Sequence, residues 1–351
     1  MKLGLHLIFI FSLVAGVAAQ SGRVKPAETP TPWPFPKPTI IYVPTQSTTK
    51  SSSPAAKPTP PADDEVVKVA SMLVPIPVSV VDAKGVAITN LKLADFELKI
   101  DGVPAEISEL SRSETPIRLA MLFDNSGSAS IARDFEKRAA ITFFRRVIRP
   151  AKDLSALFSV AATTRLEQPL TSDPMLLIRA IEMFPRPEGG TALLDGIIEA
   201  ANYLGETPGR RIIVIVSDGE DNLSDASLEQ TLLAIQSTNC QVYVVKTTDF
   251  ENFGRTGSRT GNANTRFLLG ERRMGEITRQ TGGAVHSPLD ERELDAAFQQ
   301  ISAELSQQYV LSYYPEDDPN KRGQFREIML TLKNRPTMTV RTRKGYYVPK
   351  K

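Results

Sequence analysis

Residues 117–128 read IRLAMLFDNSGS, an apolar run of strand length that ends in a polar turn. The next segment, Ile131 to Ile148, repeats its apolar residues near the period of a helix, about 3.6 residues. A strand that leads through a short turn into an amphipathic helix is the unit from which α/β domains are built. The stretch therefore predicts an alternating α/β fold for this part of the chain.

The same alternation continues as far as Leu305. Arg211 to Val216 is a continuous apolar run, typical of a parallel strand that is covered on both faces. Leu154 to Ala161 and Arg165 to Leu170 are predicted to pair as a hairpin. The other candidates are the strands Gln241–Lys246 and Ala284–His286 and the helices Pro174–Phe184, Leu193–Leu204, Leu228–Ile235, Glu271–Gln280 and Glu291–Leu305. We expect a doubly wound, mostly parallel sheet with helices on both faces over residues 113–305.

The segments on either side have a different pattern. Residues 65–112 and 306–351 contain short runs rich in Val, Ile, Tyr and Thr, broken by Asp-Gly and Pro, which is typical of antiparallel strands. The candidates are Met72–Val81, Phe96–Ile100, Gln308–Tyr314, Phe325–Leu332 and Met338–Val348. Because the ends of a doubly wound domain often lie close together, we expect both segments to pack as one β-sandwich around the inserted α/β domain.

The first residues predict export. A charged start, an apolar run to Val17 and the small residues Ala18-Ala19 have the pattern of a signal peptide over residues 1–19. We expect a secreted, periplasmic or cell-surface protein with no transmembrane segment after cleavage. The alternative is an uncleaved anchor, although about 15 apolar residues are few for a span of about 20. Residues 20–64 are crowded with Pro, Thr and Ser, which predicts a disordered linker or a ligand for a proline-binding module.

Composition narrows the classes of partner and site. Lys and Arg number 42 against 40 acidic residues, so no bulk charge favours nucleic acid or an anionic membrane as the partner. A single cysteine, Cys240, excludes an internal disulfide and a thiolate zinc cluster. We interpret Cys240 as a buried small hydrophobe, with a reactive thiol as the alternative.

Three polar clusters follow expected strands or lead into expected helices. They are Asp124-Asn-Ser126-Gly-Ser128, Gly189-Gly-Thr191 and Ser217-Asp218-Gly-Glu220-Asp221. Ligand sites of parallel sheets lie at the carboxyl ends of the strands. Oxygen donors alone select a hard cation, here Mg²⁺ or else Mn²⁺ or Ca²⁺. The predicted metal ligands are Asp124, Ser126, Ser128, Thr191 and Asp218. With hydroxyls and water as the main ligands, the cation stays electrophilic and seeks an acidic group from outside.

The same residues have simpler explanations. Asp124, Ser126 and Ser128 could cap the following helix through local hydrogen bonds, and Thr191 could cap the next one. Asp195, four residues after Thr191, could support the metal site or interact with the helix dipole in the first turn. These alternatives remain open at the level of sequence.

The order D-x-S-x-S, then G-G-T, then S-D-G after an apolar strand resembles the von Willebrand factor A (VWA) domain with its metal-ion-dependent adhesion site, or MIDAS. All five motif positions are present, and Asn125 occupies a variable one, where an inward-turned amide would compete for the metal. In the flanks, V-x-V-x-D, L-x-x-x-D-F-E-L and R-K-G-Y-Y resemble a bacterial group of exported, VWFA-related proteins. The resemblance implies a Rossmann-like sheet with one antiparallel edge strand. It also implies an adhesion or assembly role without catalysis, in which a protein ligand offers an exposed Asp or Glu.

Two other functions use the same residues. A metal-dependent hydrolase could use Asp218 and Glu220 with a metal-activated water, and His286 is the one histidine outside the signal segment that could serve as a base. A structural scaffold would bind no metal. We expect a binding protein rather than an enzyme, since the chain has no glycine-rich phosphate loop of the Walker type.

The segment Glu251 to Leu269 shows no periodicity and is expected to be a long loop beside the metal. It carries Arg255, Arg259 and Arg266 against one acid, Glu251. We predict that these arginines bind and steer an acidic partner. The alternative is an insertion with solvated charges.

Overall fold

The computed structural model describes residues 73–349, apart from 113–114, 128–132, 258–264 and 316–317. Residues 67–351 belong to one compact unit. The expected signal peptide (1–19) and linker (20–64) lie outside the described residues, as do Ser128 and Arg259. In the described part of the chain, no helix is long and apolar enough to cross a membrane.

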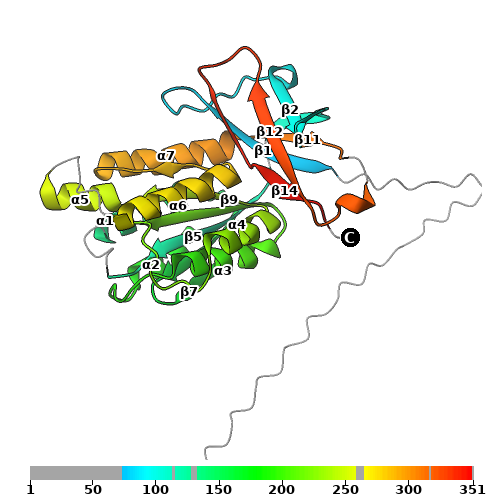
Figure 1. Cartoon of the computed structure of the whole chain (residues 1–351). Helices are drawn as coiled ribbons and strands as arrows, with labels where there is room; N and C mark the ends of the chain where they lie inside the picture. The colour runs from blue at the N-terminus through cyan, green and yellow to red at the C-terminus, as the bar shows by residue number, and fades with distance from the viewer. Residues whose placement is uncertain (1–72, 113–114, 128–132, 258–264, 316–317, 350–351) are drawn as a thin grey trace, which may run out of the picture. The chain divides into compact units, whose positions relative to one another are not determined.

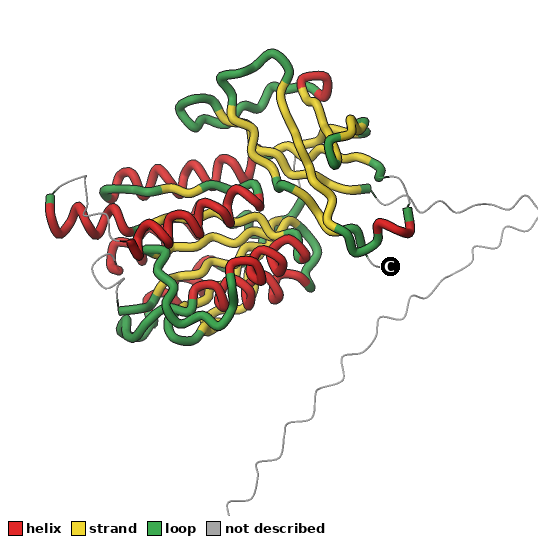
Figure 2. Tube along the Cα trace, in the orientation of Figure 1, coloured by secondary structure: helices red, strands yellow, loops and turns green. Residues whose placement is uncertain are grey.

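A six-stranded sheet with the order β10-β9-β8-β5-β6-β7 forms the centre of the α/β domain (Figures 1 and 2). Its strands are β5 (Ile117–Asp124), β6 (Leu154–Val160), β7 (Thr164–Thr171), β8 (Arg210–Ser217), β9 (Cys240–Lys246) and β10 (Val285–His286). Neighbouring strands are parallel except at one edge, where β7 pairs antiparallel with β6. The expected mostly parallel sheet with one antiparallel edge strand is confirmed.

Helices cover both faces of this sheet. They are α1 (Arg133–Val147), α2 (Pro174–Glu182), α3 (Leu193–Gly205), α4 (Leu228–Ser237), α5 (Thr248–Thr256), α6 (Thr265–Thr281) and α7 (Glu291–Gln307). Leu119, Met121 and Phe123 of β5 pack with α1, α2 and α7. Ala120 and Leu122 pack with α3, α4 and α6 on the other face. Because successive side chains of a strand point to opposite faces, a strand between two helical layers must be apolar throughout, as β5 is.

Two antiparallel four-stranded sheets share a third core. Their orders are β13-β1-β11-β4 and β14-β12-β2-β3, so both combine strands from before and after the α/β domain. The strands are β1 (Val74–Val81), β2 (Phe96–Ile100), β3 (Val103–Ala105), β4 (Glu109–Arg112), β11 (Tyr309–Tyr313), β12 (Phe325–Leu332), β13 (Thr339–Thr342) and β14 (Gly345–Tyr347); two short 3-10 turns are Leu93–Asp95 and Pro319–Lys321. The expected β-rich flanks are confirmed as antiparallel sheets.

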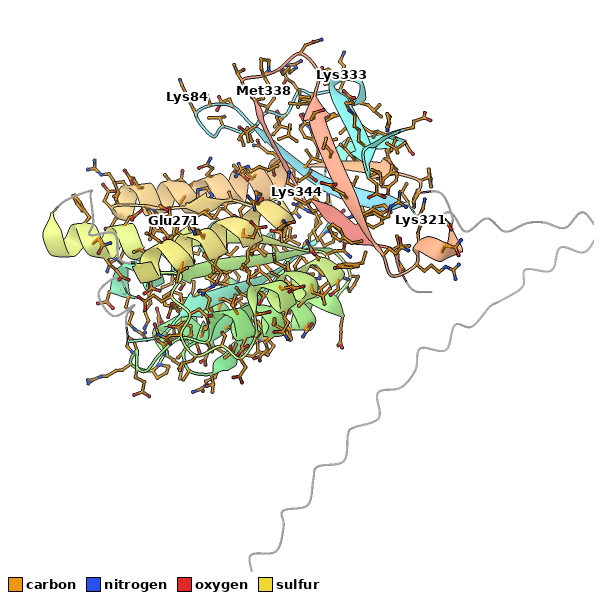
Figure 3. The ribbon with its side chains drawn as sticks, in the orientation of Figure 1. Lys84, Glu271, Lys321, Lys333, Met338 and Lys344 are labelled. Atoms are coloured by element: carbon orange, nitrogen blue, oxygen red, sulfur yellow. The ribbon has the colours of Figure 1, made fainter. Side chains whose placement is uncertain are left out.

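Gln308 joins α7 to β11 at the point where the α/β domain meets the flanking sheets. Its side-chain amide donates to Ser79 Oγ (3.0 Å) and to Gln241 Oε1 (3.2 Å), and its own Oε1 accepts from Arg210. Lys344, labelled in Figure 3, donates its backbone N–H to the carbonyl of Gln280 near the end of α6 (3.0 Å). The flanking sheets therefore contact the ends of β8 and β9 that lie farthest from Asp124.

The expectation of a long loop over Glu251–Leu269 is wrong. Helix α5 begins directly after β9, and α6 begins at Thr265. Phe250 of α5 stacks on Phe135 of α1, with ring centroids 4.1 Å apart. Local signals for this helix were present, namely Asp249 and Glu251 in its first turn and Gly257 at its C-cap.

The β-branched and aromatic residues of Met338–Val348 predict a single strand, but the segment does not form one. Instead it forms β13 and β14, which belong to different sheets. The chain turns between them at Arg343 and Lys344, where Lys344 bonds to the end of α6 through its N–H and accepts from the Ile328 N–H (2.7 Å) through its carbonyl. The hydrogen bond from Lys344 to Gln280 of α6 thus lies between the end of β13 and the start of β14.

Gly283 lies where the chain leaves α6 for β10, and a Cβ there would sit 1.7 Å from the carbonyl oxygen of Val242 in β9. Because the obstacle is backbone of a central strand, Gly283→Ala should lower the free energy of unfolding by roughly 1–3 kcal/mol. Gly275→Ala is the matched control, since a Cβ at this position of α6 meets nothing within 4 Å. It should stabilise the protein by about 0.5–1 kcal/mol. Urea unfolding measures both, and equal effects would contradict the account.

Candidate functional site

Asp124 is the last residue of β5 and is only 1% exposed. Its Oδ1 accepts from the Ser126 N–H (2.9 Å) and its Oδ2 accepts from the Ser217 hydroxyl (2.6 Å). Ser217 is the last residue of β8, the strand next to β5. The Asp124 carboxylate therefore bridges the carboxyl ends of two neighbouring parallel strands.

Asp218 follows β8 directly and is 2% exposed. Its Oδ1 accepts from the Glu220 N–H (2.8 Å), and its carbonyl accepts from the Thr248 hydroxyl at the start of α5 (2.8 Å). The turn at Gly219 has a positive φ of 81°, a conformation that favours glycine. Asp218 is thereby held on the same edge of the sheet as Asp124.

Backbone hydrogen bonds join the three polar clusters to one another. Gly127 N–H donates to the Gly189 carbonyl (3.1 Å), Thr191 N–H donates to Asn222 Oδ1 (2.9 Å), and Asn222 N–H donates to the Thr191 carbonyl (3.0 Å). The structure therefore brings together four of the five predicted metal ligands. These four are Asp124, Ser126, Thr191 and Asp218, each 1–2% exposed, and Ser128 lies outside the described residues.

Thr191 does not cap the helix that follows it. The N-cap of α3 is Ala192, which makes no side-chain capping bond. The Leu193 N–H is satisfied instead by Asp221 Oδ1 (2.9 Å), a carboxylate from the third cluster. Within the described residues the Thr191 hydroxyl has no hydrogen bond of its own. For Asp124 the structure does not distinguish a capping role from a metal-binding role, because its bond from the Ser126 N–H fits both.

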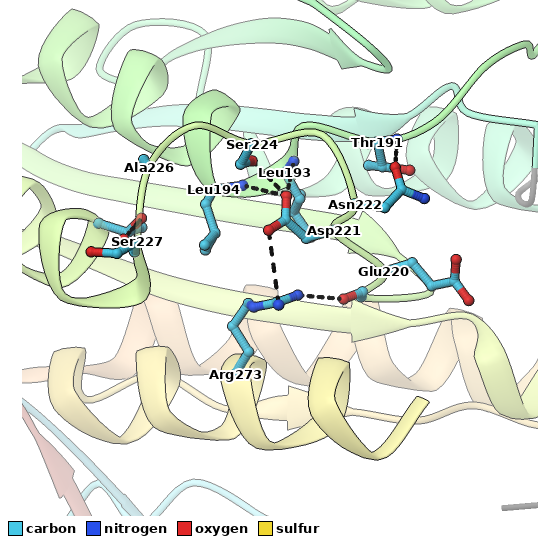
Figure 4. A network of polar contacts seen from close by, with 12 residues as sticks. Thr191, Leu193, Leu194, Glu220, Asp221, Asn222, Ser224, Ala226, Ser227 and Arg273 are labelled. Atoms are coloured by element: carbon cyan, nitrogen blue, oxygen red, sulfur yellow. Dashed lines mark hydrogen bonds and ion pairs between the residues drawn. The ribbon is translucent and has the colours of Figure 1, made fainter. Parts of the chain in front are cut away.

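Asp221 and Arg273 were not among the residues predicted from sequence, yet they hold the site together (Figure 4). Asp221 also accepts from the Ser224 hydroxyl, and its Oδ2 lies 3.8 Å from Arg273 Nη2 of α6. Arg273 further donates to the Gly219 carbonyl (3.4 Å). The available signal was its place in the third polar cluster, three residues after Asp218, but its partners come from other parts of the chain.

Asp195 and Asn125 both have structural roles. The Asp195 carboxylate accepts from the backbone N–H groups of Asp225 and Ala226, each at 3.0 Å, and so fixes the loop that follows Asp218. Asn125 Oδ1 accepts from the guanidinium of Arg133. This bond occupies the oxygen that would otherwise compete for a metal.

Negative charge accumulates inside the protein around this edge. Burial, followed by repulsion from Asp218, raises the pKa of Asp124 to about 6. Glu136 of α1 is fully buried, and neither of its carboxyl oxygens has a hydrogen-bond partner among the described residues. Burial, then Asp124 and Glu251, holds the Glu136 pKa well above its usual value. Glu136 shares a helical stripe with Ala140 and Phe143, and this stripe was the signal that could have identified it.

The donor set fits a hard divalent cation. Two buried carboxylates and the hydroxyls of Ser126 and Thr191 are oxygen donors of the kind that Mg²⁺ prefers, with water as the usual remaining ligand. Lys246, a buried cation at the end of β9, lies within ion-pair distance of Asp249 (3.6 Å) and Glu271 (3.7 Å). Among the described residues, no three His, Cys, Asp or Glu side chains gather into a metal-binding group. The predicted ligand set contains only two side chains of these types, Asp124 and Asp218.

His286 lies in the edge strand β10. Its Nε2 is buried without a hydrogen-bond partner in the described part of the chain, and burial followed by repulsion from Arg341 lowers its pKa to about 4. No hydrogen bond joins His286 to a serine there. A Ser-His-Asp arrangement is thus not formed by the described residues.

Comparisons with known proteins identify the type of the α/β domain. Residues 119–220 match the model of the von Willebrand factor type A domain. No curated protein matches the chain. Solved structures with a similar fold include an aerotolerance-related membrane protein from Bacteroides fragilis carrying multiple mutations to serine (20% identity, 54% of this chain and 98% of that chain, TM-score 0.43). BatB from Bacteroides thetaiotaomicron has 19% identity over the same shares, with a TM-score of 0.43. A von Willebrand factor type A protein from Catenulispora acidiphila has 13% identity (73% of this chain, 74% of that chain, TM-score 0.43).

The buried acids predict an unusual dependence of stability on pH. In EDTA, the folded protein holds protons on Asp124 and Glu136 that the unfolded chain releases near pH 4, so stability should fall as pH rises through the folded pKa values. Glu136→Gln, a neutral residue of similar shape, should raise the melting temperature at pH 8, by roughly 2–4 °C per kcal/mol gained, and change it little at pH 4.

Glu199→Gln is the matched control, since Glu199 is an exposed glutamate on α3. It should leave the pH profile unchanged. A Glu136→Gln variant that melts at a lower temperature than the wild type at pH 8 would show that the Glu136 carboxylate is stabilised in the fold, contrary to the account.

Proposed function

We propose, from the von Willebrand factor type A domain that residues 119–220 match, that this protein is a metal-dependent protein-binding module. Domains of this type generally bind other proteins. In the proposal a divalent cation, Mg²⁺ in the first instance, is held by the five motif residues: Asp124, Ser126, Ser128, Thr191 and Asp218. The bound cation supplies an electrophile for an acidic group of a partner protein.

The observation that carries the proposal is the burial of Asp124 and Asp218 side by side. Two carboxylates in a medium of low dielectric repel each other, and their desolvation costs free energy unless a cation or a proton compensates for it. The donors to Asp124 in the described part of the chain are the Ser126 N–H and the Ser217 hydroxyl, which are both neutral. A divalent cation would compensate for both charges at once.

The hydroxyl groups support the same reading. Thr191 is 1% exposed and its N–H and carbonyl are both bonded to Asn222, while its hydroxyl makes no hydrogen bond to another described residue. Neutral hydroxyl ligands add no negative charge to the site. A cation coordinated in this way keeps more of its positive charge for an external carboxylate than one surrounded by acidic side chains.

Three arginines, Arg255, Arg259 and Arg266, are proposed to attract the acidic partner. Arg255 belongs to α5 and Arg266 to the first turn of α6. Both helices approach the edge of the sheet at which Asp124 and Asp218 lie. Thr248 of α5 bonds to Asp218, and Gly270 of α6 packs against Gly219. We place the action of the protein outside the cytoplasm, on the strength of the signal-peptide pattern in residues 1–19.

Metal binding predicts stabilisation by mass action. At a Mg²⁺ or Mn²⁺ concentration of 100 times Kd, residues 66–351 should gain about 2.7 kcal/mol, which corresponds to roughly 5–10 °C in the melting temperature. Asp124→Ala should abolish this rise. Asp225→Ala, which removes an exposed carboxylate from the loop that follows Asp218, should leave it intact. Calorimetry that finds no response of the wild type to either metal would rule the proposal out.

The arginines predict an effect on association. Replacing Arg255, Arg259 and Arg266 with serine should slow the binding of an oligoglutamate peptide in Mg²⁺, more strongly at low salt than at high salt, with metal affinity nearly unchanged. The control removes three exposed cations from elsewhere: Arg145, Arg322 and Lys333. Surface plasmon resonance measures both. If the two triple variants associate at the same rate, these arginines do not steer the ligand.

A further inference from the structure

A cavity of about 360 Å³ lies at the opposite end of the central sheet from Asp124. Its floor is formed by residues 209–212, where β8 begins, and by residues 239–241, where β9 begins. Its walls come from the flanking sheets, including Pro77 of β1 and Val310 of β11. The volume falls within the range of small-molecule sites, about 300–1,000 Å³.

The cavity has an apolar body. Val74, Pro77, Ile212, Val310, Tyr346 and Pro349 contribute to its lining. Val310 is only partly buried on its strand, so part of its surface faces this space. Such a lining favours a ligand with an apolar portion, because transfer of that portion from water is favourable.

The charges on the cavity have one sign. Arg210, Arg211 and Arg343 line it, and its described lining includes no Asp or Glu. Arg211 donates to the carbonyls of Thr207 (3.0 Å) and Thr238 (2.7 Å). Arg343 donates to Asn239 Oδ1 and to the carbonyl of Pro75 (2.8 Å). Neither Arg211 nor Arg343 forms an ion pair with a carboxylate in the described part of the chain.

Arg343 is the best placed of these three arginines to bind an anionic group of a ligand. Its guanidinium lies over the ring of Tyr346, 5.6 Å from the centroid. Its Nε is buried and lacks a hydrogen-bond acceptor among the described residues. Burial lowers the pKa of Arg343 to about 10. A carboxylate at this guanidinium would form a charge-assisted hydrogen bond, which is stronger than a bond between neutral groups.

We propose that this cavity binds a small organic anion with an apolar body, such as a medium-chain carboxylate, with the carboxylate at Arg343 and the chain against Ile212 and Val310. The site is separate from the proposed metal site and does not rest on it. An experiment in EDTA therefore tests this inference alone, since the metal site is then unable to bind carboxylates.

The probe is octanoate, titrated calorimetrically into the full chain in EDTA. Octanoate should bind at one site, at least about tenfold more tightly than octanol or octylamine, because octanol lacks the negative charge that pairs with the guanidinium and octylamine is repelled by it. Val310→Phe should block binding by filling the cavity, and Arg343→Gln should weaken it about tenfold or more. Arg145→Gln, at an exposed arginine of α1, is the control and should change nothing.

If octanoate fails to bind wild-type protein, or binds Val310→Phe as tightly, the proposal is overturned. If Arg343→Gln fails to fold, the comparison of octanoate with octanol on the wild type still decides the role of charge.

Discussion

Two carboxylates buried next to each other are the constraint around which the α/β domain is arranged. The parallel order of β5 and β8 puts Asp124 and Asp218 at the same edge of the sheet, and the apolar runs before them carry both into the interior. Burial and mutual repulsion raise the pKa of Asp124 to about 6. In the proposed function a divalent cation compensates for both charges and also binds the partner, which a proton would not do.

The surrounding loops keep this costly arrangement in place. Asp221 satisfies the start of α3 and lies close to Arg273 of α6, while Asn222 bonds both sides of the Thr191 backbone. Thr191 and Asp218 are therefore connected through one segment, residues 218–222, rather than held by two independent loops. In the proposed metal site this connection would matter, because oxygen ligands of Mg²⁺ must meet a narrow geometry.

The sequence allowed the sheet, the order of its helices and the edge at which the polar clusters meet to be predicted, because strand and helix periods are local properties. It did not lead to α5, because the Gly, Asn and Arg content of residues 251–269 favours a loop, although Gly257 caps the C-terminus of this short helix. Nor did it reveal the break between β13 and β14, which a contact with α6 produces. Glu136 was not singled out from the sequence: its place on an apolar helical stripe indicates burial, but the acids beside it, Asp124 and Glu251, come from other parts of the chain.

The most direct test of the account is diffraction from crystals soaked in Mn²⁺, recorded at a wavelength where manganese scatters anomalously. The account predicts one strong anomalous peak bounded by the Asp124 and Asp218 carboxylates and the hydroxyls of Ser126 and Thr191, and no such peak in crystals of Asp124→Ala. A well-ordered wild-type structure in which this position contains no anomalous scatterer, with manganese in excess, would contradict it.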